Sequence, residues 1–221
     1  RRYYNIKSDN IGYILNVPSR TSFVFEKERN KNRFNFGNQF IVSYCGGIIQ
    51  GRGIESIIEA YALFQKEIKM SSLLLAGSIE DDYKELLVNQ IKKLGINSNK
   101  VIFTGKLDNE TLMSYMSSSD VTFALYSNVS LNNRMCSPNK VFDALHSKTY
   151  VITTKSFLTN DIVSKNNIGE TLQSINPNSI QRALVRCYNK RNNQIPNEKW
   201  MDLQLKYCWE SEFKRVKKHM F

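Results

Sequence analysis

The 221-residue sequence predicts an α/β fold: a single doubly wound, mainly parallel, Rossmann-like sheet with flanking helices. Three observations support this prediction. Short apolar runs alternate with segments whose apolar residues recur at helical spacing, the pattern of βα units. Glycines stand at the ends of several apolar runs, where strands give way to turns. A hydrophobic fraction of 41% with 23% charged residues is enough for a sizeable core.

Buried apolar runs predict five strands, and a weaker run predicts a sixth. These runs are residues 40–45, 73–77, 101–105, 121–125, 150–153 and 168–172. An earlier short strand is expected at residues 11–17, where Pro18 would end it.

Helical spacing of apolar side chains predicts a helix after each of the first four strands. Residues 54–68 and 83–94 form the first two, and Gly95 stands where a C′ residue belongs. Asp108 is expected to cap the third, whereas Ser137 and Pro138 are expected as N-cap and first residue of the fourth. Residues 179–189 and 209–218 are expected to form two later helices.

The expected domain organisation has three parts. Residues 1–38 show no clear hydrophobic periodicity, and we interpret them as a linker or as the tail of a preceding domain. Residues 39–205 form the Rossmann-like domain, and residues 206–221 contain a C-terminal helix.

Charge and cysteine usage narrow the function classes. The net charge of +11 permits an anionic substrate, a membrane surface or nucleic acid, but neither an RNA-binding signature nor a zinc finger is present. A nucleic-acid-binding protein is therefore the less favoured alternative. No metal site is expected, because the four cysteines lie far apart without a C-x-x-C pair. No run of about eighteen apolar residues predicts a membrane span. The reduced thiols favour a cytosolic protein.

Topology places the candidate site between two loops. In doubly wound sheets ligands bind beyond the carboxyl ends of the strands, where the strand order reverses. That rule brings the glycine-rich turn at residues 45–53 face to face with the helix start near Ser137. Two helix N-termini, Arg52 and Lys140 give about three positive charges, which match the two to three negative charges of a nucleoside diphosphate.

Two other phosphate motifs fit the turn poorly. Residues 46–53 resemble a P-loop, but Arg52 replaces the lysine and Gly53 replaces the hydroxyl residue that would bind magnesium. The dinucleotide fingerprint G-x-G-x-x-G is absent, and no acidic residue closes the second strand.

Several motifs together resemble the C-terminal, donor-binding domain of retaining GT-B glycosyltransferases, the family-four or group one class. Gly46-Gly47 followed by Arg52-Gly53 is similar to the family's first glycine block, and the sequence SPNKVFDAL at residues 137–145 is similar to its PNK-x-F-E variant in surface-polysaccharide synthesis. Residues 73–77, 101–105, 112–121 and 207–210 also resemble family segments in the same order, so that the resemblance spans residues 39–221.

The resemblance implies donor-binding roles for particular residues. Arg52, with Gly53 and the backbone of Gly46 and Gly47, would contact the donor diphosphate. Asp143 would hold the ribose hydroxyls. The phosphates and the departing nucleoside diphosphate would be held by Ser137, Pro138, Asn139 and Lys140. The nucleobase would be gripped at Gly105, Lys106 and Leu107. Arg52 and Lys140 would be the catalytic cations.

This sequence departs from the family pattern at three positions. Gly47 replaces a frequent arginine, and Asp143 is one methylene shorter than the usual glutamate. Met135 stands where the family has an acidic residue that contacts the donor sugar. Asn132, Asn133 and Arg134 are the nearby candidates for that contact.

The implied function is transfer of a sugar from a nucleotide-sugar to an acceptor hydroxyl with retention, as a hexosyltransferase of surface polysaccharide synthesis. The resemblance implies neither cofactor nor metal, and an acceptor-binding domain on the N-terminal side. Only 38 residues precede the expected Rossmann-like domain, so we expect negligible transferase activity from this chain alone. A cytoplasmic location is expected, with peripheral association at the inner face of the membrane for a lipid-linked acceptor. A non-catalytic nucleotide-binding module of the same fold is the alternative.

Overall fold

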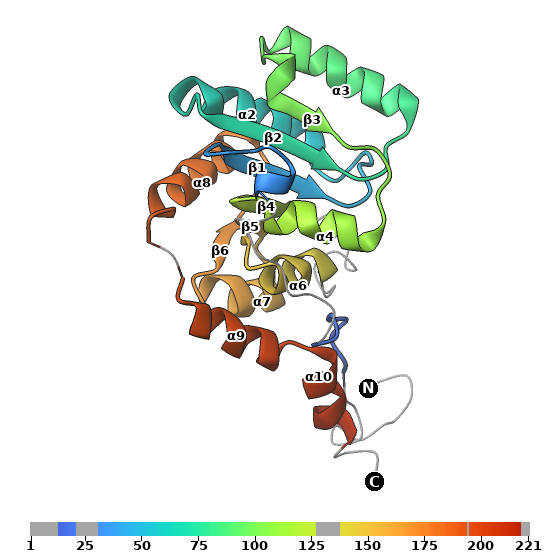
Figure 1. The fold of residues 1–221 in the computed structure, drawn as a ribbon, viewed down its shortest axis with the longest axis vertical. Coiled ribbons are helices and arrows are strands. Elements are labelled where there is room, and N and C mark those ends of the chain that lie inside the picture. Colours follow the sequence, from blue (N-terminus) through green and yellow to red (C-terminus); the bar gives the residue numbers. More distant parts are fainter. Residues whose placement is uncertain (1–12, 21–30, 127–137, 194, 218–221) are drawn as a thin grey trace.

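The computed structural model describes residues 13–20, 31–126, 138–193 and 195–217. These residues contain one six-stranded sheet in the order β3-β2-β1-β4-β5-β6, and all of its pairings are parallel (Figure 1). Its strands are β1 (Phe40–Cys45), β2 (Ser71–Ala76), β3 (Val101–Phe103), β4 (Val121–Ala124), β5 (Tyr150–Thr154) and β6 (Gly169–Leu172). The predicted doubly wound, Rossmann-like sheet is confirmed.

Helices join the strands and continue the chain after β6. They are α2 (Ile54–Glu67), α3 (Asp81–Lys93), α4 (Asn109–Ser117), α6 (Asn139–His146), α7 (Phe157–Thr159), α8 (Pro177–Lys190), α9 (Asn197–Lys206) and α10 (Trp209–Lys217). Two short turns complete the set, the 3₁₀ turn η2 (Ser98–Lys100) and the π-helical turn η3 (Asn160–Ser164). Among the helices of the described ranges, none has the length and apolar character needed to cross a membrane.

The sheet is the middle layer of three. Successive side chains of a strand point to opposite faces, so Val42 and Tyr44 enter one hydrophobic cluster while Ile41 and Cys45 enter the other. The first cluster is completed by α2, α3 and α8, and the second by α4, α6, η3 and α9. Both faces of the sheet are thus buried, which explains why its strands read as continuous apolar runs.

The predicted helix ends are largely confirmed. Asp108 precedes α4 and accepts a hydrogen bond from the Thr111 N–H at 2.8 Å. Gly95 follows the C-cap of α3 with a φ of +67°, as a C′ residue should. Asn176 caps α8 by accepting from the Ser179 N–H at 2.9 Å, although the sequence suggested a later start for this helix.

The predicted start of α6 is wrong by one residue. Pro138 is the N-cap rather than the first helical residue, because its ψ of 101° is extended, and the helix begins at Asn139. Ser137, the expected N-cap, lies outside the described residues.

Two further expectations differ from the structure. Residues 13–17 form no strand, because the Leu15 N–H donates to the Glu212 carboxylate at 2.9 Å instead of to a neighbouring strand; residues 11 and 12 lie outside the described ranges. Helix α9 was not expected, since it buries only Trp200 and Leu203 and leaves Met201 and Leu205 exposed.

The segment of residues 13–20 is fastened to α10. The Trp209 N–H donates to the Pro18 carbonyl at 3.0 Å, and the Glu210 carboxylate accepts from the Ser19 hydroxyl at 2.6 Å. Leu15 and Val17 are buried in the second hydrophobic cluster. Figure 1 shows this blue segment beside the red helix α10, near the foot of the molecule. The division of the chain at residues 38 and 205 stays a prediction.

The ends of β1 and β2 approach each other closely. The Gly46 N–H donates to the Ala76 carbonyl at 2.8 Å, and the Ile48 N–H to the Ser78 carbonyl at 2.9 Å. A Cβ on Gly77 would lie 2.1 Å from the Gly46 carbonyl oxygen, and Gly77 has a φ of +140°. Only glycine fits at this contact, which fixes the turn after β1 against the sheet.

We expect Gly77→Ala to lower the free energy of unfolding by about 3 kcal/mol, since the added Cβ displaces backbone rather than a side chain. Gly95→Ala is the matched control: its φ is also positive, but nothing lies within 4 Å of its Cβ position, so about 1 kcal/mol is expected. Urea denaturation of both variants measures the difference. Equal losses would contradict the proposed steric contact.

Candidate functional site

The candidate site lies at the carboxyl edge of the sheet, where the chain winds in two directions. Strand β1 pairs with β2 on one side and with β4 on the other, so the loops after β1 and β4 diverge from neighbouring strands. The loop after β1 leads to Arg52 and α2, and the connection after β4 leads to Lys140 in the first turn of α6. The expected neighbourhood of the first and fourth strands is confirmed by the strand order, while residues 127–137 of the connection after β4 lie outside the described ranges.

Lys140 reaches across to the turn after β1. A Cβ on Gly46 would lie 2.8 Å from the Lys140 Nζ and 3.0 Å from its Cε, so the lysine occupies the space that Gly46 leaves open. The ammonium also lies 5.3 Å from the centroid of the Tyr44 ring. Such a cation–π contact favours the charged side chain at this place.

Arg52 has a comparable aromatic partner. Its guanidinium carbon lies 5.5 Å from the centroid of the Tyr126 ring, at the end of β4. The Tyr126 N–H in turn donates to the Thr154 hydroxyl at the end of β5, at 3.1 Å. Three neighbouring strands, β1, β4 and β5, therefore contribute to the position of the two cations.

The electrostatics show that these groups share one environment. Burial lowers the pKa of Lys140, and the nearby Arg52 charge lowers it further, while Asp143 opposes the shift. Burial raises the pKa of Asp143 to about 6, against the attraction of Lys140. Burial raises the pKa of Tyr44 to about 12, and Arg52 opposes this shift. Perturbed groups that gather at one edge of a sheet mark a candidate functional site.

Tyr44 connects the backbone of the turn with the lysine. Its hydroxyl donates to the Gly47 carbonyl at 3.1 Å while its ring faces the Lys140 ammonium. Neither Tyr44 nor Tyr126 was assigned a role from the sequence. The available signal was a tyrosine near the carboxyl end of an apolar run, which alone does not reveal what the ring faces.

The structure brings most of the predicted residues to this edge. Gly53 is the N-cap of α2, and a Cβ there would lie 3.1 Å from Ile175 and 3.3 Å from Leu125, which follow β6 and β4. Gly105 is joined to Gly77 by a β-bridge, so the loop after β3 adjoins the chain after β2.

The remaining predicted residues differ in exposure. Lys106 and Asn139 are exposed, Pro138 is buried, and Leu107 packs against the second hydrophobic cluster. Outside the described ranges lie Ser137, Met135 and the donor-sugar candidates Asn132, Asn133 and Arg134. The donor-binding roles of all these residues stay predictions.

Metal-binding side chains do not gather in the described ranges: no group of three or more His, Cys, Asp or Glu residues there could hold an ion. The expectation of a metal-free site stays a prediction.

Comparison with known proteins identifies related sequences. A family model described as glycosyl transferases group 1 matches residues 24–199. An uncharacterized glycosyltransferase of Methanocaldococcus jannaschii is 24% identical over 196 residues, which cover 86% of this chain and 47% of that protein. The chain thus spans about half the length of the curated relative it matches.

Solved structures share the fold at low sequence identity. HepE from Anabaena, in complex with UDP and glucose, aligns with a TM-score of 0.74 at 15% identity over 94% of this chain and 56% of that one. Sucrose-phosphate synthase from Thermosynechococcus elongatus aligns with a TM-score of 0.69 at 19% identity, over 88% of this chain and 48% of that one. The C-terminal domain of a group 1 glycosyl transferase from Francisella tularensis aligns with a TM-score of 0.61 at 16% identity, over 94% of this chain and 97% of that one. The predicted GT-B type of fold is confirmed.

Asp143 leads to a pH-dependent prediction. Its folded-state pKa of about 6 lies above its usual value of 3.8, so its contribution to stability is present at low pH and is lost as the pH rises toward 6. We expect Asp143→Asn, which cannot ionise, to raise the free energy of unfolding by about 2 kcal/mol at pH 7. At pH 4 the variant and the unmodified chain should differ little.

Urea denaturation at both pH values tests this expectation. Asp161→Asn is the control, because the Asp161 side chain is exposed and paired with Lys165. A difference between Asp143→Asn and the unmodified chain that does not change between pH 4 and 7 would contradict a buried, proton-binding Asp143.

Proposed function

We propose that this chain, which belongs to the group 1 glycosyl transferases, binds the nucleoside diphosphate part of a nucleotide-sugar between the loops after β1 and β4. The observation that carries the proposal is the convergence of Arg52 and Lys140 where the strand order reverses. Burial and the nearby Arg52 charge both disfavour the charged form of Lys140, and a diphosphate between the two side chains offsets that penalty.

The proposed donor pose follows from the geometry of the two loops. Lys140, held against Gly46 and over the Tyr44 ring, is placed to contact one phosphate. Arg52, from the opposite loop, is suited to a bidentate contact with phosphate oxygens. Asp143 lies one turn after the start of α6 and is the candidate partner for ribose hydroxyls, since among the described residues no hydrogen bond or ion pair occupies its carboxylate.

The proposed reaction is transfer of a sugar to an acceptor hydroxyl, with the departing diphosphate stabilised by Arg52, Lys140 and the N-terminus of α6. Positive groups that are fixed before the reaction stabilise developing negative charge without reorganisation. On this proposal the cations take the place of a metal ion. Retention of configuration and a hexose donor are the finer parts of the proposal and rest on the family resemblance.

Neighbours with the same fold support a nucleotide-sugar as donor, because HepE was solved with UDP-glucose as well as with UDP. The identity between HepE and this chain is 15%, so base and sugar are left open. A neighbouring acceptor-binding domain, a lipid-linked acceptor at the inner face of the membrane, and a place in surface polysaccharide synthesis belong to the proposal as well. These parts of the proposal concern a whole protein, whereas the chain matches about half the length of its curated relative.

The alternative from another class is a non-catalytic module that binds the same nucleotide. Binding of a nucleoside diphosphate fits either function, whereas transfer of sugar by a chain with an upstream acceptor domain restored would select the enzyme. A nucleic-acid-binding protein would instead bind polyanions in a salt-dependent way without preference for a nucleotide.

We expect Arg52→Ala to weaken nucleoside diphosphate binding by about ten- to a hundredfold, since a charge-assisted phosphate contact is lost. A thermal-shift panel of nucleoside diphosphates and their sugars identifies the ligand, and calorimetric titration gives the affinities. Lys92→Ala on α3 is the control, because this exposed lysine carries the same charge away from the site.

Two outcomes would contradict the proposal. One is equal weakening by Lys92→Ala and Arg52→Ala, which would indicate a general charge effect. The other is loss of binding when EDTA removes divalent cations, which would contradict a metal-free donor site.

A further inference from the structure

Tyr44 contacts both walls of the proposed diphosphate site. It stands one residue before the end of β1, and its side chain is only 1% exposed. Its hydroxyl donates to the Gly47 carbonyl in the turn after β1, at 3.1 Å. The centroid of its ring lies 5.3 Å from the Nζ of Lys140 in α6. Because close packing holds a buried ring in one orientation, both contacts are made from a fixed position.

The hydroxyl contact restrains one peptide unit of the turn. The Gly47 carbonyl and the Ile48 N–H belong to the same peptide unit. The Ile48 N–H donates to the Ser78 carbonyl at 2.9 Å, while the carbonyl end of the unit accepts from Tyr44. The unit is thus bonded at both ends, once to the chain after β2 and once to a side chain of β1.

The ring contact stands where an ion pair is missing. Among the described residues, no carboxylate lies within ion-pair distance of the Lys140 Nζ. Burial and the Arg52 charge disfavour the ammonium form of this lysine. Asp143 and, more weakly, the Cys45 thiol oppose them. The face of the Tyr44 ring adds a further electrostatic contact that favours the ammonium.

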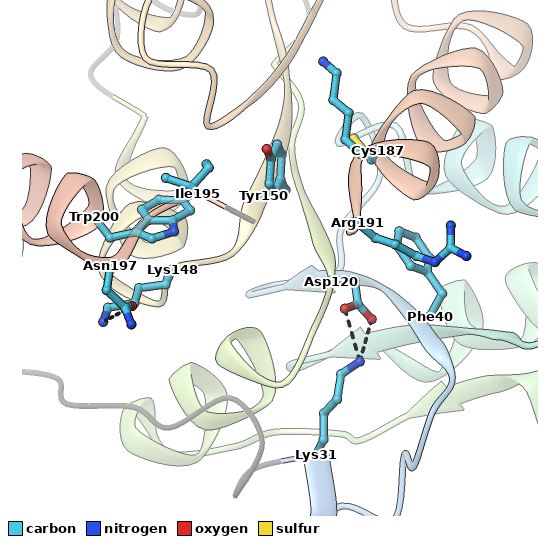
Figure 2. A pocket seen from close by; sticks show the side chains of 11 residues that line it. Lys31, Phe40, Asp120, Lys148, Tyr150, Cys187, Arg191, Ile195, Asn197 and Trp200 are labelled. Atoms are coloured by element: carbon cyan, nitrogen blue, oxygen red, sulfur yellow. Dashed lines mark hydrogen bonds and ion pairs between the residues drawn. The ribbon is translucent and has the colours of Figure 1, made fainter. Parts of the chain in front are cut away.

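A lysine near the opposite, amino edge of the sheet has a carboxylate partner instead. Lys31 donates to both carboxylate oxygens of Asp120, at 2.9 and 3.1 Å, and both side chains are mostly buried (Figure 2). A carboxylate bonded to Lys140 in the same way would occupy the N–H donors that a phosphate needs. An aromatic ring stabilises the ammonium and leaves those donors available.

We propose that Tyr44 is a positioning residue of the diphosphate site: its hydroxyl orients the turn after β1, and its ring holds the Lys140 ammonium where a phosphate can bind it. This role rests on the proposed function, because it assigns the ammonium to a phosphate of a nucleotide-sugar. The two contacts can be separated. Tyr44→Phe removes the hydroxyl and keeps the ring, whereas Tyr44→Leu removes both.

The first experiment titrates Lys140 in the ligand-free chain. NMR with isotope-labelled lysine side chains follows the ammonium groups, and Lys140→Gln identifies the signal. Tyr44→Phe variants that carry one, two or three ring fluorines nearly keep the size of the side chain but weaken the negative face of the ring. We expect the midpoint of the Lys140 titration to fall stepwise, by about one pH unit in all, while the midpoint of Lys31 stays constant.

The second experiment measures nucleotide-sugar binding between pH 7 and 8.5. UDP-glucose, ADP-glucose and GDP-mannose are the probes, because their diphosphates do not titrate in this range. Tyr44→Phe should weaken binding by about threefold at every pH, since one hydrogen bond of the turn is lost. Tyr44→Leu should weaken it by about tenfold, and by more as the pH rises, since more of Lys140 then loses its proton.

Tyr61→Leu is the control for lost volume. Tyr61 is a fully buried tyrosine of α2, and its hydroxyl lies 3.4 Å from that of Ser71, at the start of β2. This variant should lose stability but keep its affinity for the nucleotide-sugar.

Two results would overturn the role of Tyr44. One is a Lys140 midpoint that stays constant through the fluorinated series. The other is a loss of affinity in Tyr44→Leu that does not change with pH or does not exceed that in Tyr61→Leu. Failure of the proposed function gives a different result. In that case the Lys140 midpoint would still depend on fluorine, but none of the three nucleotide-sugars would bind.

Discussion

The mutual repulsion of Arg52 and Lys140 is the constraint that organises the carboxyl edge of the sheet. Burial imposes a desolvation penalty on the charged form of Lys140, and the nearby Arg52 charge disfavours that form further. The folded chain nevertheless holds both, with a tyrosine ring beside each cation and Asp143 nearby. An edge of this kind is less stable empty than filled by an anion, and the difference in free energy contributes to binding.

The frame that holds these charges together is made of backbone contacts. The turn after β1 is bonded to the chain after β2, and Gly77 allows the two to touch. On the other side, α6 is anchored by the buried side chains of Val141 and Phe142. These contacts fix the turn after β1 and the helix α6, which carry Arg52 and Lys140, and fixed supports of this kind are what preorganised sites require.

The sequence was sufficient to predict the sheet and to place Arg52 and Lys140 at its carboxyl edge. Apolar runs gave the strands because both faces of a parallel sheet are buried, and the glycine turn and the topological rule located Arg52 and Lys140. The tyrosine contacts could not be predicted, since the direction of a ring at a strand end depends on the neighbouring loop. A cavity at the amino edge of the sheet could not be predicted from the sequence either, because its wall combines residues from Lys31 to Trp200 that no local pattern connects.

The raised pKa of Asp143 has a consequence for ligand exchange. A carboxyl with a pKa of about 6 is partly protonated just below neutral pH, and a phosphate nearby would make its ionised form still less favourable. Anion binding then draws a proton from solution, and by linkage acidification favours the bound state. The heat released on binding would accordingly vary with the ionisation enthalpy of the buffer, so the site would couple nucleotide occupancy to proton uptake.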